Sequence, residues 1–366
     1  MTGRKIVNIV IVLALTTVIG GCVSYGSGTI ARDRFNYNEA IARSRSEQML
    51  LNIVRLRYIQ MPDFLAISSI ITNYTYDSSV GILGSVSHTP ANEIVGGSAN
   101  LKYIEKPTIS YSPLVGQEFA KRLLKPISVN GIFALGQAGW PIDLLMAIAL
   151  QRINDVKNMG FGTVPAPGAL DQNRQFEREA AHLNAFSRVL KLMILLADRG
   201  GLEVQRNGDS PQLYFSPVVD HDTGKLITEL KSLLNLDTDL NAFTITRRAT
   251  KRHHNEITIQ SRSLMSIMAF LSRGVMVPEK DEQDGLVVVF PEIARRAIEK
   301  HSALKIYSAT TLPPLAYVSV KYRDTWFYIK DNDITSKRTF ATLQVLFQLQ
   351  ESSRGGTAPI LTLPAG

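Results

Sequence analysis

The chain has little cysteine: Cys22 is the only one among its 366 residues. A single thiol excludes an internal disulfide and a multi-cysteine metal site, so the folded body must be stabilised by packing alone. The sequence also contains no G-x-S-x-G, no H-E-x-x-H, no phosphate-binding loop and no detectable repeat. These absences favour a non-enzymatic protein without a cofactor or a metal site.

Two patterns leave an enzymatic alternative open. Ser302 and Lys305 have the S-x-x-K spacing of penicillin-binding enzymes, although no K-T-G accompanies them. Closely spaced acids occur in the second half of the chain: Asp220, Asp222, Asp237 and Asp239. Because paired carboxylates act as general acid and base, the alternative function is that of an envelope hydrolase acting on peptidoglycan.

The amino-terminal residues form a targeting signal. Arg4 and Lys5 precede an apolar run over residues 6–19, which is too short to span a bilayer and typical of a signal-peptide core. The string Ile19-Gly20-Gly21 then leads directly into Cys22. This arrangement resembles the lipobox of bacterial lipoproteins; the alternative is an ordinary signal peptide beside a chance cysteine.

The resemblance implies that residues 1–21 are removed and that Cys22 carries the lipid anchor. Val23 stands where an aspartate would favour retention in the inner membrane, so we expect an outer-membrane protein that faces the periplasm, with surface exposure left open. The mature part also resembles uncharacterised proteobacterial outer-membrane lipoproteins, which implies a location but no activity. The expected partners are the membrane and either envelope proteins or further copies of this chain.

The charge of the chain is positive, at +8. Removal of Arg4 and Lys5 with the signal peptide leaves 38 basic residues against 32 acidic ones, a net charge of +6. On a secreted, membrane-tethered protein such a charge favours anionic lipid, lipopolysaccharide phosphate or peptidoglycan carboxylates over nucleic acid.

A cluster of basic residues is the candidate anion-binding site: Arg247, Arg248, Lys251 and Arg252. It joins predicted strands at residues 242–246 and 256–260, so we expect it at the tip of a hairpin. A solvated surface without a partner is the alternative, because charge runs are usually solvated.

Alternating helical and strand periodicities predict an α+β fold. The expected order is a signal peptide (1–21), a tether (22–35), an amino-terminal α+β domain (36–159), a linker (160–175), a carboxy-terminal α+β domain (176–350) and a tail (351–366). Within it we expect helices at 117–124, 142–156, 176–197, 225–234, 261–272 and 336–350, a strand at 286–290 and a hairpin at 317–330. A further helix ends before Pro62, and its arginines 43, 45, 55 and 57 are expected mostly on a solvated face.

The alternating pattern of residues 72–106 predicts a long amphipathic β-hairpin with its turn at residues 89–92. Apolar positions alternate with polar ones along both arms: Tyr74, Tyr76, Val80, Ile82 and Val86, then Val95, Leu101 and Tyr103. Each arm exceeds the roughly 9–11 residues that a tilted strand needs to cross a bilayer. The hairpin is therefore a candidate membrane-facing segment.

One hairpin cannot close a barrel, so a membrane role requires several copies in a ring. Such a ring is similar in principle to the curli secretion channel, whose lipoprotein subunits each lend strands. The alternative is an amphipathic hairpin that covers one side of a soluble core. The sequence thus predicts an outer-membrane lipoprotein that acts in envelope assembly or transport.

Overall fold

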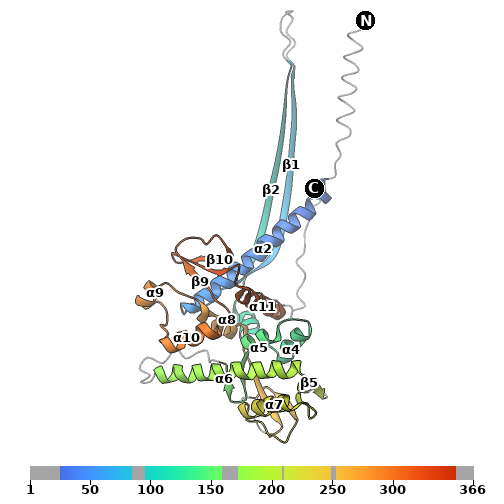
Figure 1. Ribbon diagram of the computed structural model, residues 1–366. Coiled ribbons are helices and arrows are strands. Elements are labelled where there is room, and N and C mark those ends of the chain that lie inside the picture. Colours follow the sequence, from blue (N-terminus) through green and yellow to red (C-terminus); the bar gives the residue numbers. More distant parts are fainter. Residues whose placement is uncertain (1–24, 85–94, 159–171, 208–209, 249–252, 352–366) are drawn as a thin grey trace, which may run out of the picture. The chain divides into compact units, whose positions relative to one another are not determined.

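The computed structural model describes residues 25–84, 95–158, 172–207, 210–248 and 253–351, and Figure 1 traces the course of the chain. The chain divides into two units, Met1–Met49 and Leu50–Gly366, and each is considered by itself. The described part of the first unit belongs to helix α2, which runs from Tyr25 to Arg57 and so ends in the second unit. The second unit combines helices with small antiparallel and mixed sheets, which confirms the predicted α+β class.

The remaining described helices lie in the second unit. They are α3 (Gly116–Phe119), the π-helix η1 (Ala120–Leu124), α4 (Val129–Gln137), α5 (Ile142–Ala149), α6 (Gln172–Asp198), α7 (His221–Leu233), α8 (Leu264–Leu271), the 3-10 helix η2 (Ser272–Gly274), α9 (Glu279–Gln283), α10 (Glu292–His301) and α11 (Ile334–Glu351). Side chains cap three of them: Asp220 accepts from the first turn of α7, Ser263 from that of α8, and Asp333 from that of α11.

Among the described residues, six strands form a mixed sheet in the order β4-β3-β8-β7-β6-β5. They are β3 (Leu150–Ile153), β4 (Val156–Lys157), β5 (Leu202–Asn207), β6 (Ser210–Phe215), β7 (Ala242–Thr246) and β8 (Glu256–Ser261). Only β7 and β8 pair in parallel. Phe243 and Ile245 of β7 are buried and alternate with half-buried residues, whereas in β8 Glu256 and Thr258 are buried along with Ile257 and Ile259.

Helix α6 is central to the core of the second unit. Its apolar side chains Leu183, Phe186, Val189, Leu192 and Leu196 are buried, and it packs against α5, α7, α10, β4 and β5. Its segment Ala180–Asp198 is, by length and composition, apolar enough to cross a membrane. Core helices pass the same test, and these contacts are those of a core helix.

A second, three-stranded sheet has the order β10-β11-β9 among the described residues. Its strands are β9 (Tyr307–Ala309), β10 (Ala316–Tyr322) and β11 (Thr325–Lys330). The two-residue turn between β10 and β11 holds Arg323, the first of its two residues, in the left-handed region at φ +52°. This hairpin confirms the prediction for residues 317–330.

The long hairpin consists of β1 (Leu65–Gly84) and β2 (Val95–Pro113), of 20 and 19 residues. The strands pair antiparallel from Leu65↔Pro113 to Gly84↔Val95, with one irregularity between Ile67 and Ser69. Pro107 stands within β2 opposite Thr72. The predicted hairpin is confirmed and extends further toward its base than residues 72–106, whereas its predicted turn at 89–92 and Val86 lie outside the described residues.

Four predictions of local structure are wrong. Helix α2 begins at Tyr25, so part of the predicted tether is helical. Helix α5 ends at Ala149 and the chain continues as β3, because residues 150–153 pair with β8 instead of prolonging the helix. The predicted strand at 286–290 is irregular, and α10 follows it.

The fourth difference concerns the predicted linker at 160–175. Strands β3 and β4 precede it and β5 to β8 follow it, yet all belong to one sheet. The regions 36–159 and 176–350 therefore share a sheet and do not have separate ones. The linker itself lies mostly outside the described residues, and α6 begins within its last part, at Gln172.

Candidate functional site

The long hairpin brings together the positions that the sequence singled out. The register pairs Tyr74 with Glu105, Tyr76 with Tyr103, Ser78 with Leu101 and Val80 with Ala99, and it pairs Ile82 with Gly97 and Gly84 with Val95. Paired positions of antiparallel strands share a face. Apart from Val86, which the structure does not describe, the apolar positions predicted for the two arms consequently share one face with Ser78 and Glu105. Asp77 and Lys102 take positions on the other face, together with Leu83 and Ile104.

The edges of this hairpin are unpaired within the described part of the chain, where β1 and β2 form a two-stranded sheet. Neither strand packs extensively against another described element. Each outer edge is thus a row of backbone donors and acceptors able to pair with a further strand. An isolated two-stranded hairpin is marginally stable in water, so a hairpin of this length is expected to have a partner.

The predicted basic cluster does not lie at a hairpin tip. The cluster lies between β7 and β8 in the sequence, and these strands pair in parallel, so it does not connect the antiparallel strands of a hairpin. The Arg248 Nη1 donates to the Glu256 Oε1 at 2.9 Å, and the Arg247 Nη2 donates to the Ser128 Oγ at 3.3 Å. Lys251 and Arg252 lie outside the described residues.

The closely spaced acids have structural roles. The Asp220 carboxylate caps α7, accepting from the backbone N–H groups of Asp222 and Thr223 and from the Thr223 hydroxyl. These hydrogen bonds, above all those with Thr223, lower the pKa of Asp220. The Asp237 carboxylate accepts from the backbone of Asp239 in a tight turn. Capping and turn geometry therefore account for two acids that the hydrolase alternative invoked.

Ser302 and Lys305 do not form the helical turn that S-x-x-K chemistry requires. Ser302 follows the last residue of α10 in an extended conformation, and its hydroxyl donates to the Leu304 carbonyl at 2.7 Å. Within the described residues, no group of three or more His, Cys, Asp or Glu side chains is placed to hold a metal ion.

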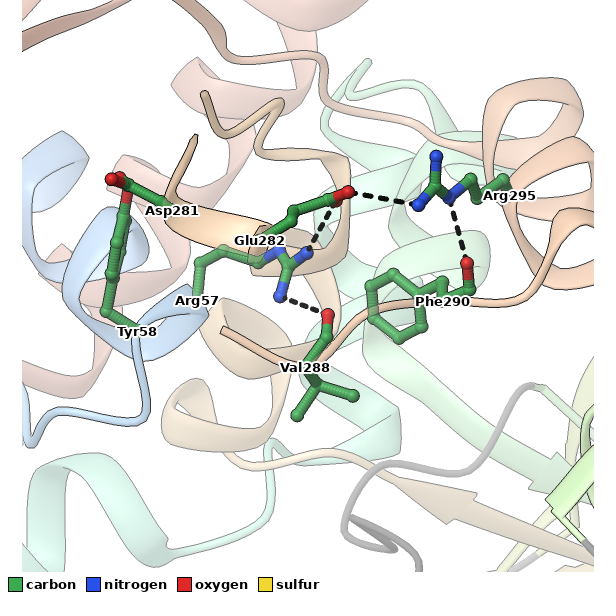
Figure 2. A network of polar contacts seen from close by, with 7 residues as sticks. All are labelled: Arg57, Tyr58, Asp281, Glu282, Val288, Phe290 and Arg295. Atoms are coloured by element: carbon green, nitrogen blue, oxygen red, sulfur yellow. Dashed lines mark hydrogen bonds and ion pairs between the residues drawn. The ribbon is translucent and has the colours of Figure 1, made fainter. Parts of the chain in front are cut away.

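A polar network that the sequence did not indicate connects the end of α2 to α9 and α10 (Figure 2). The Glu282 carboxylate lies between two guanidinium groups: its Oε2 is 3.0 Å from the Arg295 Nη2, and its Oε1 is 3.9 Å from the Arg57 Nη2. The Arg295 Nε donates to the Phe290 carbonyl at 2.8 Å. Next to it, the Tyr58 hydroxyl donates to the Asp281 carboxylate.

Arg57 is the unusual member of this network. Its side chain is only 5% exposed, so the prediction of a solvated face is wrong for this residue. Burial lowers the pKa of Arg57, whereas Glu282 raises it. Its guanidinium lies over the Phe290 ring at 4.8 Å and donates from Nη1 to the Val288 carbonyl at 3.0 Å.

Tyr58 is held in its neutral form. Burial raises the pKa of Tyr58 above its ordinary value, and the hydrogen bond to Asp281 raises it further. The ring also packs edge-on against Phe327 of β11 and lies 5.1 Å from the Tyr322 ring. These contacts join the end of α2 to the three-stranded sheet.

A pocket of about 730 Å³ opens beside the network. Its basic lining consists of Arg57, Arg273 and Arg295, and its acidic lining consists of Glu279, Glu282 and Glu299. Apolar side chains complete the wall: Val275, Met276, Val277, Val289, Phe290 and Ile298. This volume and this mixture of apolar walls with a few convergent polar groups are typical of small-molecule sites.

A second pocket, of about 480 Å³, adjoins the first, since Glu299 and Ser302 line both. Three lysines line it, namely Lys300, Lys305 and Lys330, and the Lys330 ammonium lies 3.9 Å from the centre of the Tyr307 ring. Asp333 also lines this pocket, but its carboxylate accepts from the backbone and hydroxyl of Ser336 at the start of α11.

Comparison with known proteins gives no match: no protein-family model, no curated protein and no solved structure resembles this chain. The function must be argued from the residues themselves.

Proposed function

We propose that this chain is a lipid-anchored outer-membrane protein whose copies assemble through the β1–β2 hairpin into a membrane-inserted oligomer. Its role in this proposal is envelope assembly or transport and not catalysis. The observation that carries the proposal is the register of the hairpin. It places the described members of the predicted apolar set of both strands on one face, with Leu83 and Ile104 on the other, while both edges stay unpaired among the described residues.

The anchor is the first support. Residues 1–24 lie outside the described residues, so lipidation rests on the string Ile19-Gly20-Gly21-Cys22 alone. A single acyl chain binds membranes only marginally, and the two or three chains implied by the lipoprotein resemblance give a stable anchor.

The length of the hairpin is the second support. Uninterrupted pairing runs from Ser69↔Ser110 to Gly84↔Val95, which exceeds the roughly 9–11 residues that a tilted transmembrane strand needs. At about 3.4 Å per residue, a strand of this length extends roughly 54 Å. A hairpin of this length can cross a bilayer and still project beyond it.

The open edges are the third support. Lipid offers no partner to a backbone N–H or C=O group, so strands are stable there only in a closed barrel. Identical copies close such a barrel when β2 of one copy pairs with β1 of the next, which is a head-to-tail contact that generates a ring. The apolar face then meets lipid and the face with Asp77 and Lys102 lines the interior, as in transmembrane barrels.

The test removes the hairpin and keeps the anchor. The full-length protein is extracted from membranes in a mild non-ionic detergent, and its mass is measured by size-exclusion chromatography with light scattering. We expect a multiple of the subunit mass for the wild type. Deletion of residues 76–103 with a short glycine linker should give a folded, lipidated monomer. A wild-type protein that is itself monomeric in mild detergent contradicts the proposal.

A further inference from the structure

The pocket beside Arg57 contains a buried charge whose hydrogen-bonding capacity is largely unused. A guanidinium carries five N–H donors. The Arg57 Nη1 donates to the Val288 carbonyl, the Nη2 lies 3.9 Å from the nearest Glu282 oxygen, and the Nε is buried without a partner among the described residues. A buried charged group in this condition is costly and needs an explanation.

The charges around the pocket differ in their exposure. Glu279 and Glu299 are exposed, so water screens their charges. Glu282 is the remaining carboxylate, and it is shared between Arg57 and Arg295. Arg295 is exposed as well, so the less exposed charged groups of the lining are Arg57 and Arg273 against the single carboxylate of Glu282.

From these groups we infer that the pocket beside Arg57 binds a phosphate-bearing amphiphile. The phosphate oxygens accept from the terminal Nη groups of Arg57, since its Nε is itself fully buried, and a guanidinium is suited to the recognition of phosphate. The apolar part of the ligand packs on the wall made by Val275, Val289 and Phe290. A lipid headgroup and a free phosphate both make the contact with Arg57, but only the lipid also contacts the apolar wall.

The arrangement assigns Glu282 the role of a competitor. Its carboxylate occupies the space between Arg57 and Arg295, where a ligand anion gains most from both guanidinium groups (Figure 2). A bound phosphate displaces Glu282 toward Arg295 or is repelled by it. Loss of this negative charge should consequently strengthen the binding of anions.

The experiment uses the detergent-extracted full-length protein and three probes. Inorganic phosphate, glycerol 3-phosphate and dihexanoyl phosphatidic acid are titrated by calorimetry, with the thermal midpoint as a second measurement. We expect the phosphatidic acid to bind at least tenfold more tightly than glycerol 3-phosphate. Equal affinity for inorganic phosphate and the phosphatidic acid identifies free phosphate as the ligand and contradicts the amphiphile.

Three variants separate binding from folding. Arg57→Met keeps the length of the side chain and should reduce the affinity at least tenfold, whereas Glu282→Gln should raise it severalfold. Arg296→Met is the matched control, because Arg296 belongs to the same helix as Arg295, pairs with the exposed Glu292 and does not line the pocket.

Two results overturn the inference. The first is a wild type that binds none of the three probes. The second is an Arg57→Met variant that binds the phosphatidic acid as tightly as the wild type. If Arg57→Met does not fold, the sign of the Glu282→Gln effect decides, since unchanged or weaker binding in that variant contradicts the role given to Glu282.

Discussion

Two buried arginines show how differently one residue type is accommodated. The Arg262 side chain is almost fully buried and donates to three backbone carbonyls, those of Ile148, Leu150 and Asn158, at 2.7–3.0 Å. Its guanidinium also lies 4.0 Å from the centre of the Phe270 ring. Burial lowers the pKa of Arg262 to about 9. Arg262 thus acts as a structural cross-link, whereas Arg57 keeps unused donors beside a pocket.

The cross-link predicts a large effect on stability. Arg262→Ala removes a donor from each of three buried carbonyls, of which that of Leu150 keeps the Asn158 amide, and it opens a cavity, so we expect the free energy of unfolding to fall by about 3–5 kcal/mol. Urea denaturation of the purified protein measures it. Arg296→Ala, at an exposed position of α10, should change stability by no more than about 0.5 kcal/mol. Similar small effects for both variants contradict a structural role for Arg262.

Cys22 is the residue that we predict to be lipidated. Cys22→Ala removes the acceptor of the lipid, so labelled palmitate should no longer be incorporated and the unprocessed precursor should accumulate. Labelling in growing cells, followed by electrophoresis, measures both. Equal labelling of the variant and the wild type excludes lipidation at this residue.

At the scale of elements, amphipathic periodicity predicted where helices and strands lie, but it did not predict whether neighbouring strands run parallel or antiparallel. The apolar spacing of residues 176–197 predicted α6 closely, and the strands predicted at 242–246 and 256–260 correspond to β7 and β8. Alternation is the same in parallel and antiparallel strands, however, so it gave the wrong geometry for the connection at residues 247–255. The helix over residues 129–137 was missed because Gly131 and Gly136 weaken its local preference.

Pairing with distant strands overrode local preference elsewhere. Residues 150–153 continue an apolar run that suits a helix, yet they form β3 because β8 offers a strand edge about a hundred residues later. The two faces of the long hairpin likewise depend on how its strands pair. A shift by one residue in one strand would move its whole apolar set to the opposite face, so the observed register is the property that gives the hairpin two distinct faces.

The two faces of the hairpin give a prediction with a built-in control. Val80 lies at an apolar-face position and its neighbour Ser79 at a polar-face one. Lysine on the lipid face of a barrel costs about 2–4 kcal/mol at the midplane, and an interior position tolerates it. Val80→Lys should therefore reduce the high-mass oligomer in mild detergent, and Ser79→Lys should preserve it. The same outcome for both variants contradicts an arrangement in which one face contacts lipid while the other contacts water.

At the scale of the whole molecule, the candidate pocket could not be predicted from the sequence. Arg57 and Val288 are 231 positions apart, and no local pattern marks either residue as part of a site. The basic cluster at residues 247–252 was predicted as an anion-binding site because its charges are adjacent in sequence. The arginines of the pocket instead come from three separate elements, α2, η2 and α10. Only the folded chain brings these charges together.

Pro107 sets a boundary for any assembly of copies. Proline has no N–H group, so a strand accommodates it only where that group would face away from its partner. Since β2 stays paired with β1 through Pro107↔Thr72, the missing donor falls on the outer edge of β2, where a neighbouring copy would attach. In the proposed ring, a seam between copies would therefore be interrupted at Pro107. Continuous pairing is left to residues 95–106, which matches the depth of one lipid bilayer.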